Sequence, residues 1–433
     1  MKLRMLAIGF MCVAGILLST TPTVSRQSSP PADRERGAAI DQARAYVKQL
    51  ILKNKTPGMS VAVAIDGAIV WSEAFGEADL ENHVPVRTST KFRLGSVSKL
   101  LTVAALMRLY EQGAVDLDAP VQRYVPYFPE KEYPITLRQL AGHTAGIRHY
   151  RDGDPFVRGP HYSTVREALE LFKNDPLLFE PGTQYAYSSY GYNLISAAIE
   201  GASGKPFLDY LNEAVFVPLG MKGTVADDPF AIVAGRTRFY TVMKDGRIEN
   251  APYVDSSFRW ASGGLLSTAE DLTRLGSACL KPGFFKRETL DLLLTPQRLR
   301  SGKETGVGMG WRIGNDKTGG RFFHHGGTIE GGRAFLFVDE RTHTVIALLA
   351  NSVSDFGEEE ASAIVGFFAK QERPGSSYDV VSPDNQGLGA GGGRSRACCG
   401  SWKGNVLCVP SQKGLLAECP QRQREIAGRP AKP

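Results

Sequence analysis

Ser96 and Lys99 are the residues whose types and spacing most directly suggest chemistry. They belong to the run Ser96-Val97-Ser98-Lys99, which opens an apolar segment with helical period. Side chains at positions i and i+3 of a helix lie on the same face, one turn apart. A lysine amine placed there can take the proton of a serine hydroxyl, which is otherwise too weak a nucleophile. The spacing therefore predicts a nucleophilic Ser96, although an exposed serine and lysine on a helix surface would give the same pattern.

Four further segments turn this weak signal into a strong one. In chain order they are Gly142-His143-Thr144-Ala145-Gly146, Tyr187-Ser188-Ser189 in a tyrosine-rich loop, Ser262-Gly263-Gly264 with Asp271 after it, and His324-His325-Gly326-Gly327. With the serine–lysine pair they resemble the class C β-lactamases and penicillin-binding-protein-like serine hydrolases. That family includes family VIII esterases and mitochondrial β-lactamase-like serine proteases. The resemblance runs from about residue 41 to residue 370, with the five motifs in family order and family spacing.

The resemblance implies a role for each matching position. Ser96 matches the acylated nucleophile and Lys99 its helical partner, while Tyr187 matches the tyrosine that moves protons in acylation and deacylation. Substrate-binding and oxyanion positions fall on Ser189, His324, Gly326 and Gly327. His324 matches the first residue of the third motif, and Gly327 would follow that motif, where the family draws an oxyanion N–H from a strand. The backbone N–H of Ser96 would be the other donor. A slip of one residue would put His325 in place of His324.

The identity of the acylation base stays open at this level. Lys99 must be partly neutral to act as a base, which requires burial or a nearby cation. A tyrosine beside that lysine could instead be shifted toward the phenolate, so Tyr187 is the alternative. His143 is expected to be a structural histidine bonded to backbone.

Two positions depart from the β-lactamase pattern. Ser189 stands where β-lactamases have an asparagine that contacts the substrate amide, and His324 stands where they have a lysine. Neither change touches the nucleophile, so we expect a serine acyl hydrolase that prefers an ester or a peptide-like amide over a β-lactam. The alternatives are a β-lactamase proper, a penicillin-binding protein or sensor that is acylated without turnover, and an inactive scaffold.

The ends of the chain differ from its centre. Residues 1–25 carry Lys2 and Arg4 before an apolar stretch, which is typical of a signal peptide and predicts a secreted or periplasmic protein. An uncleaved N-terminal anchor is the alternative reading of this segment. Residues 26–374 form the expected hydrolase domain. Residues 375–433 contain a glycine run and no sustained period, which predicts a disordered extension, or else a translated frameshift.

The charge and cysteine content exclude several function classes. The net charge of +6 in 433 residues comes from the two ends, so residues 26–374 are close to neutral and no nucleic-acid partner is expected. Cys279 is the single cysteine of that span, which leaves no internal disulfide. No nucleotide or metal motif is present, so we expect neither cofactor nor metal. The expected partner is a small ester, peptide or β-lactam, with no stable membrane partner if the N-terminal segment is cleaved.

Strand and helix signals set out the elements that must position these residues. A hairpin is predicted at 60–75 around Asp66-Gly67. Four strands are predicted at 309–313, 321–324, 334–338 and 345–349. Helices are predicted at 41–53, 96–113, 136–141, 164–173, 190–202, 206–214 and 358–370, and after a capping box at 267–270. We expect an α/β (α+β) fold of β-lactamase type, in which an antiparallel sheet from both termini is covered by helices and holds a mostly helical inserted subdomain.

Overall fold

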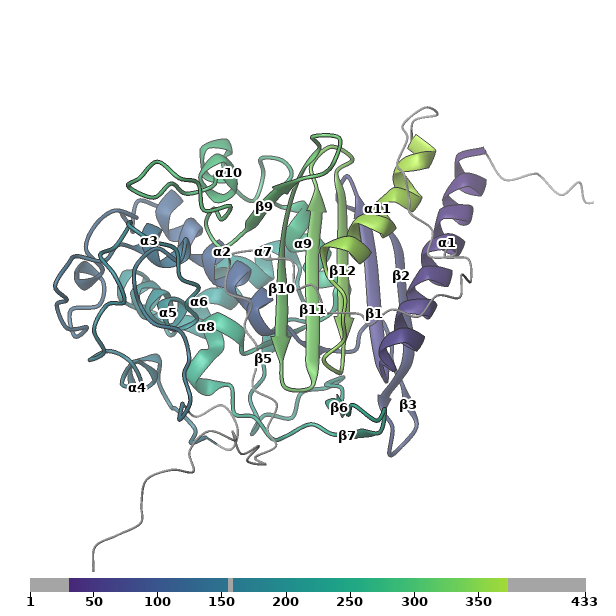
Figure 1. Ribbon diagram of the computed structural model, residues 1–433, viewed down its shortest axis with the longest axis horizontal. Helices are drawn as coiled ribbons and strands as arrows, with labels where there is room; N and C mark the ends of the chain where they lie inside the picture. Colours follow the sequence, from purple (N-terminus) through teal and green to yellow (C-terminus); the bar gives the residue numbers. More distant parts are fainter. Residues whose placement is uncertain (1–30, 155–158, 373–433) are drawn as a thin grey trace, which may run out of the picture.

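The computed structural model describes residues 31–154 and 159–372. The predicted signal peptide at 1–25 and the predicted extension at 375–433 lie outside these residues. Figure 1 shows a sheet flanked by two helices at one side of the molecule and a mostly helical region at the other. The predicted combination of an antiparallel sheet with a helical insertion is therefore confirmed.

The central sheet has seven strands in the order β3-β2-β1-β12-β11-β10-β9, and all its pairings are antiparallel. Its strands are β1 (Gly58–Ile65), β2 (Ala68–Asp79), β3 (Val84–Pro85), β9 (Arg312–Asn315), β10 (Arg321–Ile329), β11 (Gly332–Asp339) and β12 (Thr344–Ala350). The N-terminal strand β1 pairs with the C-terminal strand β12, from Met59 opposite Ala350 to Ile65 opposite Thr344. This pairing joins the two ends of the domain, as expected from the sequence.

The hairpin between β1 and β2 turns where the sequence predicts it. Asp66 and Gly67 both have positive φ, at 52° and 88°. A two-residue turn with positive φ at both positions suits the right-handed twist of the flanking strands. Aspartate and glycine tolerate that conformation better than most residues, which explains why this dipeptide marks the turn.

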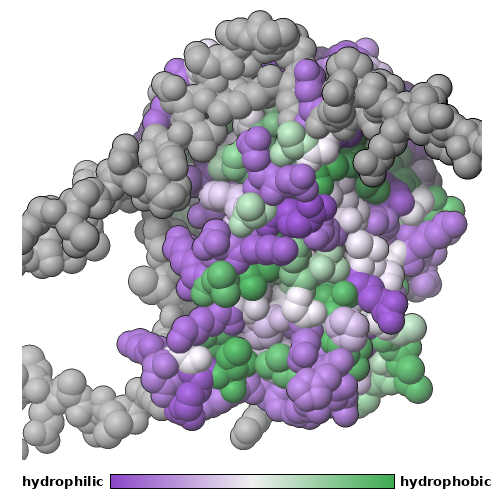
Figure 2. Space-filling view, turned by 90° about the vertical axis from the view of Figure 1, so that its right-hand side faces the viewer, coloured by the Kyte–Doolittle hydropathy of each residue, from purple (hydrophilic) through white to green (hydrophobic). Residues whose placement is uncertain are grey.

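Two helices cover one face of the sheet, as Figure 1 shows. They are α1 (Pro31–Asn54) and α11 (Glu358–Glu372), which pack against each other and against apolar side chains of the strands. Helix α1 begins ten residues before its predicted start. Figure 2, which views the molecule from this side, shows polar groups with separate apolar patches between them. The visible part of this surface therefore forms no continuous apolar face.

The opposite face carries the inserted helical region and the larger core. Helix α9 (Ala269–Ser277) packs across β1, β11 and β12. Its N-cap is Thr268, whose hydroxyl accepts from the backbone N–H of Asp271, so the predicted capping box starts one residue too early. The remaining helices are α2 (Ser98–Glu111), α3 (Leu137–Ala141), α4 (Val165–Leu169), α5 (Tyr190–Ser203), α6 (Phe207–Leu211), α7 (Val217–Leu219), α8 (Trp260–Gly263) and α10 (Arg287–Leu294).

Short helical turns and two small sheets complete the described chain. The turns are η1 (Gly95–Val97), η2 (Val121–Arg123), η3 (Asn212–Phe216) and η4 (Ser257–Arg259). One small sheet has the order β4-β8-β5, from β4 (Phe92–Arg93), β8 (Leu265–Ser267) and β5 (Val225–Ala226), and the other pairs β6 (Tyr240–Val242) with β7 (Ile248–Asn250). Across the described residues, no helix combines the length and the apolar character that a membrane span requires.

Candidate active site

Ser96 lies in η1, the tight turn that connects β4 to helix α2. The backbone N–H of Leu94, just before the turn, donates to the carbonyl of Leu265 at 2.9 Å and so fixes the turn to β8. Gly95 has φ +48°, and a Cβ there would lie 2.9 Å from the backbone nitrogen of Thr328 in β10. Only glycine allows both that conformation and that close approach. The turn therefore holds Ser96, which is partly exposed, beside the end of β10.

Lys99 follows one helical turn later and is completely buried. Its Nζ lies 3.3 Å from Oγ of Ser96, 3.0 Å from Oγ of Ser189 and 2.7 Å from the carbonyl oxygen of Ser262. Burial lowers the pKa of this amine well below its ordinary value, and the positive charges of Arg259 and Arg312 lower it further. The predicted serine–lysine contact is present, and the amine has the environment that a neutral base needs.

Tyr187 also contacts Ser96, and the centre of its ring lies 4.9 Å from Nζ of Lys99. Its hydroxyl donates to Oγ of Ser96 at 2.8 Å. Burial raises the pKa of this phenol above its ordinary value, against smaller lowering effects of the Ser96 hydrogen bond and Arg312. The sequence-based suggestion of a phenolate is therefore wrong: desolvation disfavours the charged form, and Tyr187 is a neutral phenol.

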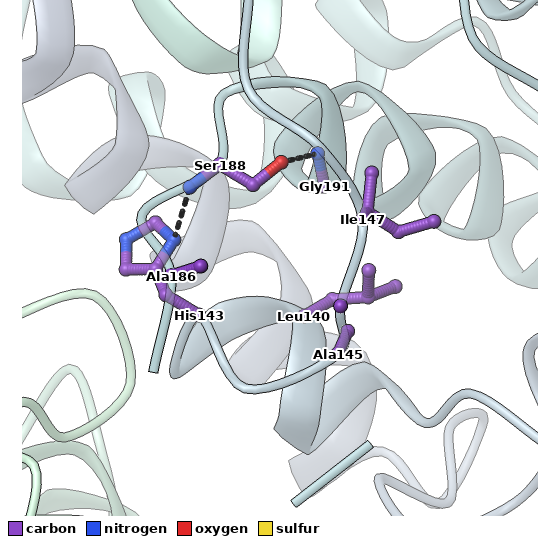
Figure 3. Close-up of a pocket in the computed structure, with 8 residues that line it drawn as sticks. Leu140, His143, Ala145, Ile147, Ala186, Ser188 and Gly191 are labelled. Atoms are coloured by element: carbon purple, nitrogen blue, oxygen red, sulfur yellow. Dashed lines mark hydrogen bonds between the residues drawn. The ribbon is translucent and has the colours of Figure 1, made fainter. Parts of the chain in front are cut away.

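His143 packs behind Tyr187, with the two ring centres 4.4 Å apart. Its Nδ1 accepts the backbone N–H of Ser188 at 3.2 Å, and the hydroxyl of Ser188 accepts the N–H of Gly191 at 2.9 Å (Figure 3). Burial lowers the pKa of His143 well below its usual range, so the ring is neutral and can accept that bond. The prediction that His143 is a structural histidine bonded to backbone is confirmed.

Ser189 is buried against Lys99, directly before helix α5. Its backbone N–H donates to Nδ1 of His149 at 3.2 Å. The expected substrate-binding position is thus a residue whose hydroxyl contacts the amine of Lys99. The sequence assigned no role to His149 or to its neighbour Tyr150, and the structure brings both to this side of the site.

The histidine pair on β10 requires a correction. His324 lies on the face covered by α1 and α11, where its ring stacks on Phe335 at 5.3 Å and its Nε2 lies 3.6 Å from the Glu358 carboxylate. His325 lies on the other face, with its ring centre 6.4 Å from that of Tyr187. Successive side chains of a strand point to opposite faces. The placement of His324 in the site is therefore wrong by one residue, and His325 is the histidine on the site's face.

The next two residues, Gly326 and Gly327, also lie on opposite faces of the sheet. A Cβ on Gly326 would meet the ring of Phe335 and the guanidinium of Arg333, away from the nucleophile. A Cβ on Gly327 would lie 1.9 Å from the carbonyl oxygen of Leu94 and 2.9 Å from the backbone nitrogen of Ser96. Gly327 therefore lets β10 pack directly on the nucleophile turn, whereas Gly326 lies outside the site.

Arg312 is a site residue that the sequence did not single out. It is exposed at the start of the edge strand β9, and its guanidinium carbon lies 5.9 Å from the centre of the Tyr187 ring. Nothing in its local pattern distinguishes it from other arginines, because the pairing of β9 with β10 is what brings it there. Among the described residues, no group of three histidine, cysteine or acidic side chains could hold a metal ion.

Comparisons with known proteins agree with this geometry. The family model described as "Beta-lactamase" matches residues 40–367. The human protein "Serine beta-lactamase-like protein LACTB, mitochondrial" is 35% identical over 381 residues, covering 68% of this chain and 70% of that protein. The "D-alanyl-D-alanine-carboxypeptidase/endopeptidase AmpH" of Escherichia coli strain K12 is 27% identical over 315 residues, covering 69% and 79%.

Solved structures show the same fold. The octameric penicillin-binding protein homologue from Pyrococcus abyssi superimposes with a TM-score of 0.65 at 23% identity, covering 76% of each chain. The family match includes the segments that carry Ser96, Lys99 and Tyr187. This chain belongs to the β-lactamase family of serine hydrolases.

Proposed function

We propose that Ser96 is the nucleophile of a serine acyl hydrolase that works through an acyl-enzyme. One observation carries the proposal: the Ser96 hydroxyl lies between the Lys99 amine, at 3.3 Å, and the Tyr187 phenol, at 2.8 Å. Both groups are close enough to exchange a proton with it, as general acid–base catalysis requires. Ser96 is partly exposed, which is consistent with access by a substrate carbonyl.

The opposite pKa shifts favour Lys99 as the base of acylation. Lys99 is neutral more readily than an ordinary lysine, whereas Tyr187 holds its proton more firmly than an ordinary tyrosine. Oγ of Ser96 attacks the substrate carbonyl while its proton moves to Nζ of Lys99. Tyr187 then gives its phenolic proton to the leaving oxygen or nitrogen, and the ammonium of Lys99 restores it. In the second half of the reaction, water attacks the acyl-enzyme with the same two groups moving protons in the reverse direction. The acid is released and the Ser96 hydroxyl is restored.

Two backbone N–H groups are placed to stabilise the oxyanion. One belongs to Ser96, and the other to Thr328, the residue that follows His325-Gly326-Gly327. The corrected histidine moves this second donor from Gly327 to Thr328. Support comes from the close packing of the two backbones, which leaves no room for a Cβ on Gly95 or Gly327. Donors fixed in this way need no rearrangement as charge develops.

Arg312 favours a substrate that carries a carboxylate close to the scissile bond. Burial and the nearby charges lower the pKa of His325 well below its usual range, so this histidine offers no positive charge. Arg312 is exposed beside Tyr187 and offers the positive charge and the planar donors of a guanidinium. We therefore infer that the enzyme acts on peptide-like amides or esters with a free carboxylate, and that Arg312 binds this group.

Paired substrates test the proposal. A chromogenic ester with a free carboxylate is compared with its neutral methyl ester and with a chromogenic cephalosporin, using the wild type, Ser96→Ala and Arg312→Gln. We expect Arg312→Gln to raise KM about tenfold for the carboxylate substrate alone, which corresponds to one charge-assisted hydrogen bond. A burst of product without turnover would instead indicate a penicillin-binding sensor. Fast cephalosporin turnover would indicate a β-lactamase proper.

The cellular location is a separate proposal. We propose export directed by residues 1–25, because two basic residues precede an apolar stretch there. The mammalian relatives are named as mitochondrial, so the two locations make different predictions. N-terminal sequencing of the native protein and fractionation of its host cells test the proposal. A mature chain that retains residues 1–25 would contradict cleavage.

A further inference from the structure

Arg93 is a buried arginine in strand β4, three residues before the proposed nucleophile. Its side chain is 7% exposed, and that of its partner Asp227 is 3% exposed. Nε of Arg93 donates to the Asp227 carboxylate at 2.7 Å, and Nη1 donates to the backbone carbonyl of Glu330 at 2.8 Å. The guanidinium carbon lies 3.8 Å from the centre of the Phe239 ring. One side chain therefore contacts a carboxylate, a carbonyl and an aromatic ring from three separate segments of the chain.

The carbonyl that Arg93 binds belongs to the strand of the proposed oxyanion site. Glu330 lies in the turn between β10 and β11, two residues after Thr328. Thr328 carries one of the two N–H groups proposed to bind the oxyanion, and Ser96 carries the other. The hydrogen bond from Arg93 to Glu330 therefore links the two segments of chain that carry these donors.

The rest of the turn packs against the same arginine and its aromatic neighbour. A Cβ on Gly332 would lie 2.8 Å from Cβ of Arg93. A Cβ on Gly331 would lie 2.5 Å from Cβ of Phe239. The pairing of β9 with β10 ends at His324, so β9 does not support the far end of β10. That end depends for its position on β11 and on the contacts of this turn.

We propose that Arg93 is a positioning residue that fixes the oxyanion strand to the nucleophile turn. A guanidinium suits this role because its planar fork donates in two directions at once, here to a carboxylate and to a carbonyl. Asp227 balances its charge, as a buried guanidinium requires. This inference rests on the proposed function and adds the group that holds the two oxyanion donors together.

Arg93→Lys is the informative variant, because it keeps a positive charge beside Asp227 and loses the planar fork. A single ammonium on a flexible chain does not hold both acceptors in the same geometry. The end of β10 can then move relative to the nucleophile turn. We expect kcat for a chromogenic ester to fall about tenfold, the usual effect of one hydrogen bond, while KM changes little.

A matched thionoester separates positioning from general damage to the site. It is the same ester with sulfur in place of the carbonyl oxygen, and sulfur is larger and accepts hydrogen bonds more weakly. The oxyanion donors therefore contribute less to its hydrolysis. Arg93→Lys should slow the thionoester less than about twofold. Damage to Ser96, Lys99 or Tyr187 would instead slow both esters equally.

Two further variants keep the test independent of folding. Arg93→Met combined with Asp227→Asn removes the ion pair without leaving an unpaired buried charge, so it should fold and show the same selective loss. Arg236→Met is the matched control. Its guanidinium also lies near the Asp227 carboxylate, at 3.8 Å, but its hydrogen bonds go to the carbonyls of Asp228 and Ala231. We expect this control to keep its activity on both esters, and thermal unfolding shows that each variant is folded.

The outcomes are distinguishable. A loss confined to the oxygen ester, in Arg93→Lys and in the double variant, would support the inference. Equal losses on both esters, or wild-type rates in these variants, would overturn it and leave the proposed nucleophile intact. A wild-type protein that hydrolyses neither ester, or a Ser96→Ala variant that stays active, would overturn the proposed function together with this inference.

Discussion

The close contact between β10 and the nucleophile turn gives a sharp prediction for Gly327→Ala. The added Cβ would lie 1.9 Å from the carbonyl oxygen of Leu94 and 2.9 Å from the backbone nitrogen of Ser96. Both are main-chain atoms, so no side chain can rotate away. Restoring a van der Waals distance of about 3.5 Å requires the strand and the turn to separate by roughly 1.5 Å. That shift would pull apart the two N–H groups proposed to bind the oxyanion.

The expected loss follows from oxyanion chemistry. Removing one donor of an oxyanion hole costs roughly 10²- to 10³-fold in kcat, and we expect a loss of that size for Gly327→Ala. Gly326→Ala is the matched control, because the atoms nearest to its Cβ would belong to the Phe335 ring and the Arg333 guanidinium, at 3.1 to 3.4 Å, and not to the main chain. It adds the same methyl group to the opposite face of the same strand. Neither glycine has a positive φ, so backbone strain does not enter the comparison.

Ester hydrolysis and thermal unfolding of both variants test this reasoning. We expect Gly326→Ala to keep kcat/KM within a few-fold of the wild type and Gly327→Ala to lose most activity while still folding. Wild-type activity in Gly327→Ala would show that β10 and the turn can separate without cost, which would refute the proposed oxyanion site. Equal losses in both variants would point to general damage to the strand.

Three further predictions concern single side chains. Ser96→Ala should abolish turnover in the ester assay, and activity within about tenfold of the wild type, a barrier change of only ~1.4 kcal/mol, would exclude Ser96 as the nucleophile. Tyr187→Phe should lower kcat steeply with little change in melting temperature, and an unchanged rate would move the proton transfer to another group. Burial lowers the pKa of His324 from 6.5 to about 4. Between these pH values the unfolded chain therefore binds more protons than the folded protein. The wild type should lose stability as the pH falls from 6.5 to 4. His324→Phe should remove up to about 3 kcal/mol of that loss, measured by denaturant unfolding at several pH values, and an unchanged pH dependence would contradict a buried neutral His324.

The fold could be predicted because its signals are local. The turn at Asp66-Gly67, the strands near both ends and the helix after the nucleophile each depend on residues adjacent in sequence. The predicted ends of strands and helices are wrong where tertiary packing overrides the local sequence preference. The strand predicted at 309–313 begins at Arg312, because the residues before it form a buried turn in which Gly310 has φ +78°. A glycine in that conformation is not recognisable from apolar residues alone.

The error at the histidine pair has a definite physical cause. Strand β10 has helices over both faces, so its residues show no alternation between apolar and polar types. Each residue type occurs twice in succession in the run Phe322-Phe323-His324-His325-Gly326-Gly327. Whichever way the strand faces, each side of the sheet therefore receives one phenylalanine, one histidine and one glycine. A slip of one residue moves every side chain to the other face. The pattern therefore contained no information that could choose between the histidines.

The assignment of acid and base depended on burial, which the sequence does not display. Lys99 and Tyr187 both contact Ser96, and either could be a base if its charge state allowed. Desolvation acts in opposite chemical directions on the two groups, since it removes the proton from a buried amine and retains the proton of a buried phenol. One physical effect thus favours both proposed roles at neutral pH, that of Lys99 as proton acceptor and that of Tyr187 as proton donor. A mutation that admitted water to this pocket should weaken both roles together, even if it left every hydrogen bond to Ser96 in place.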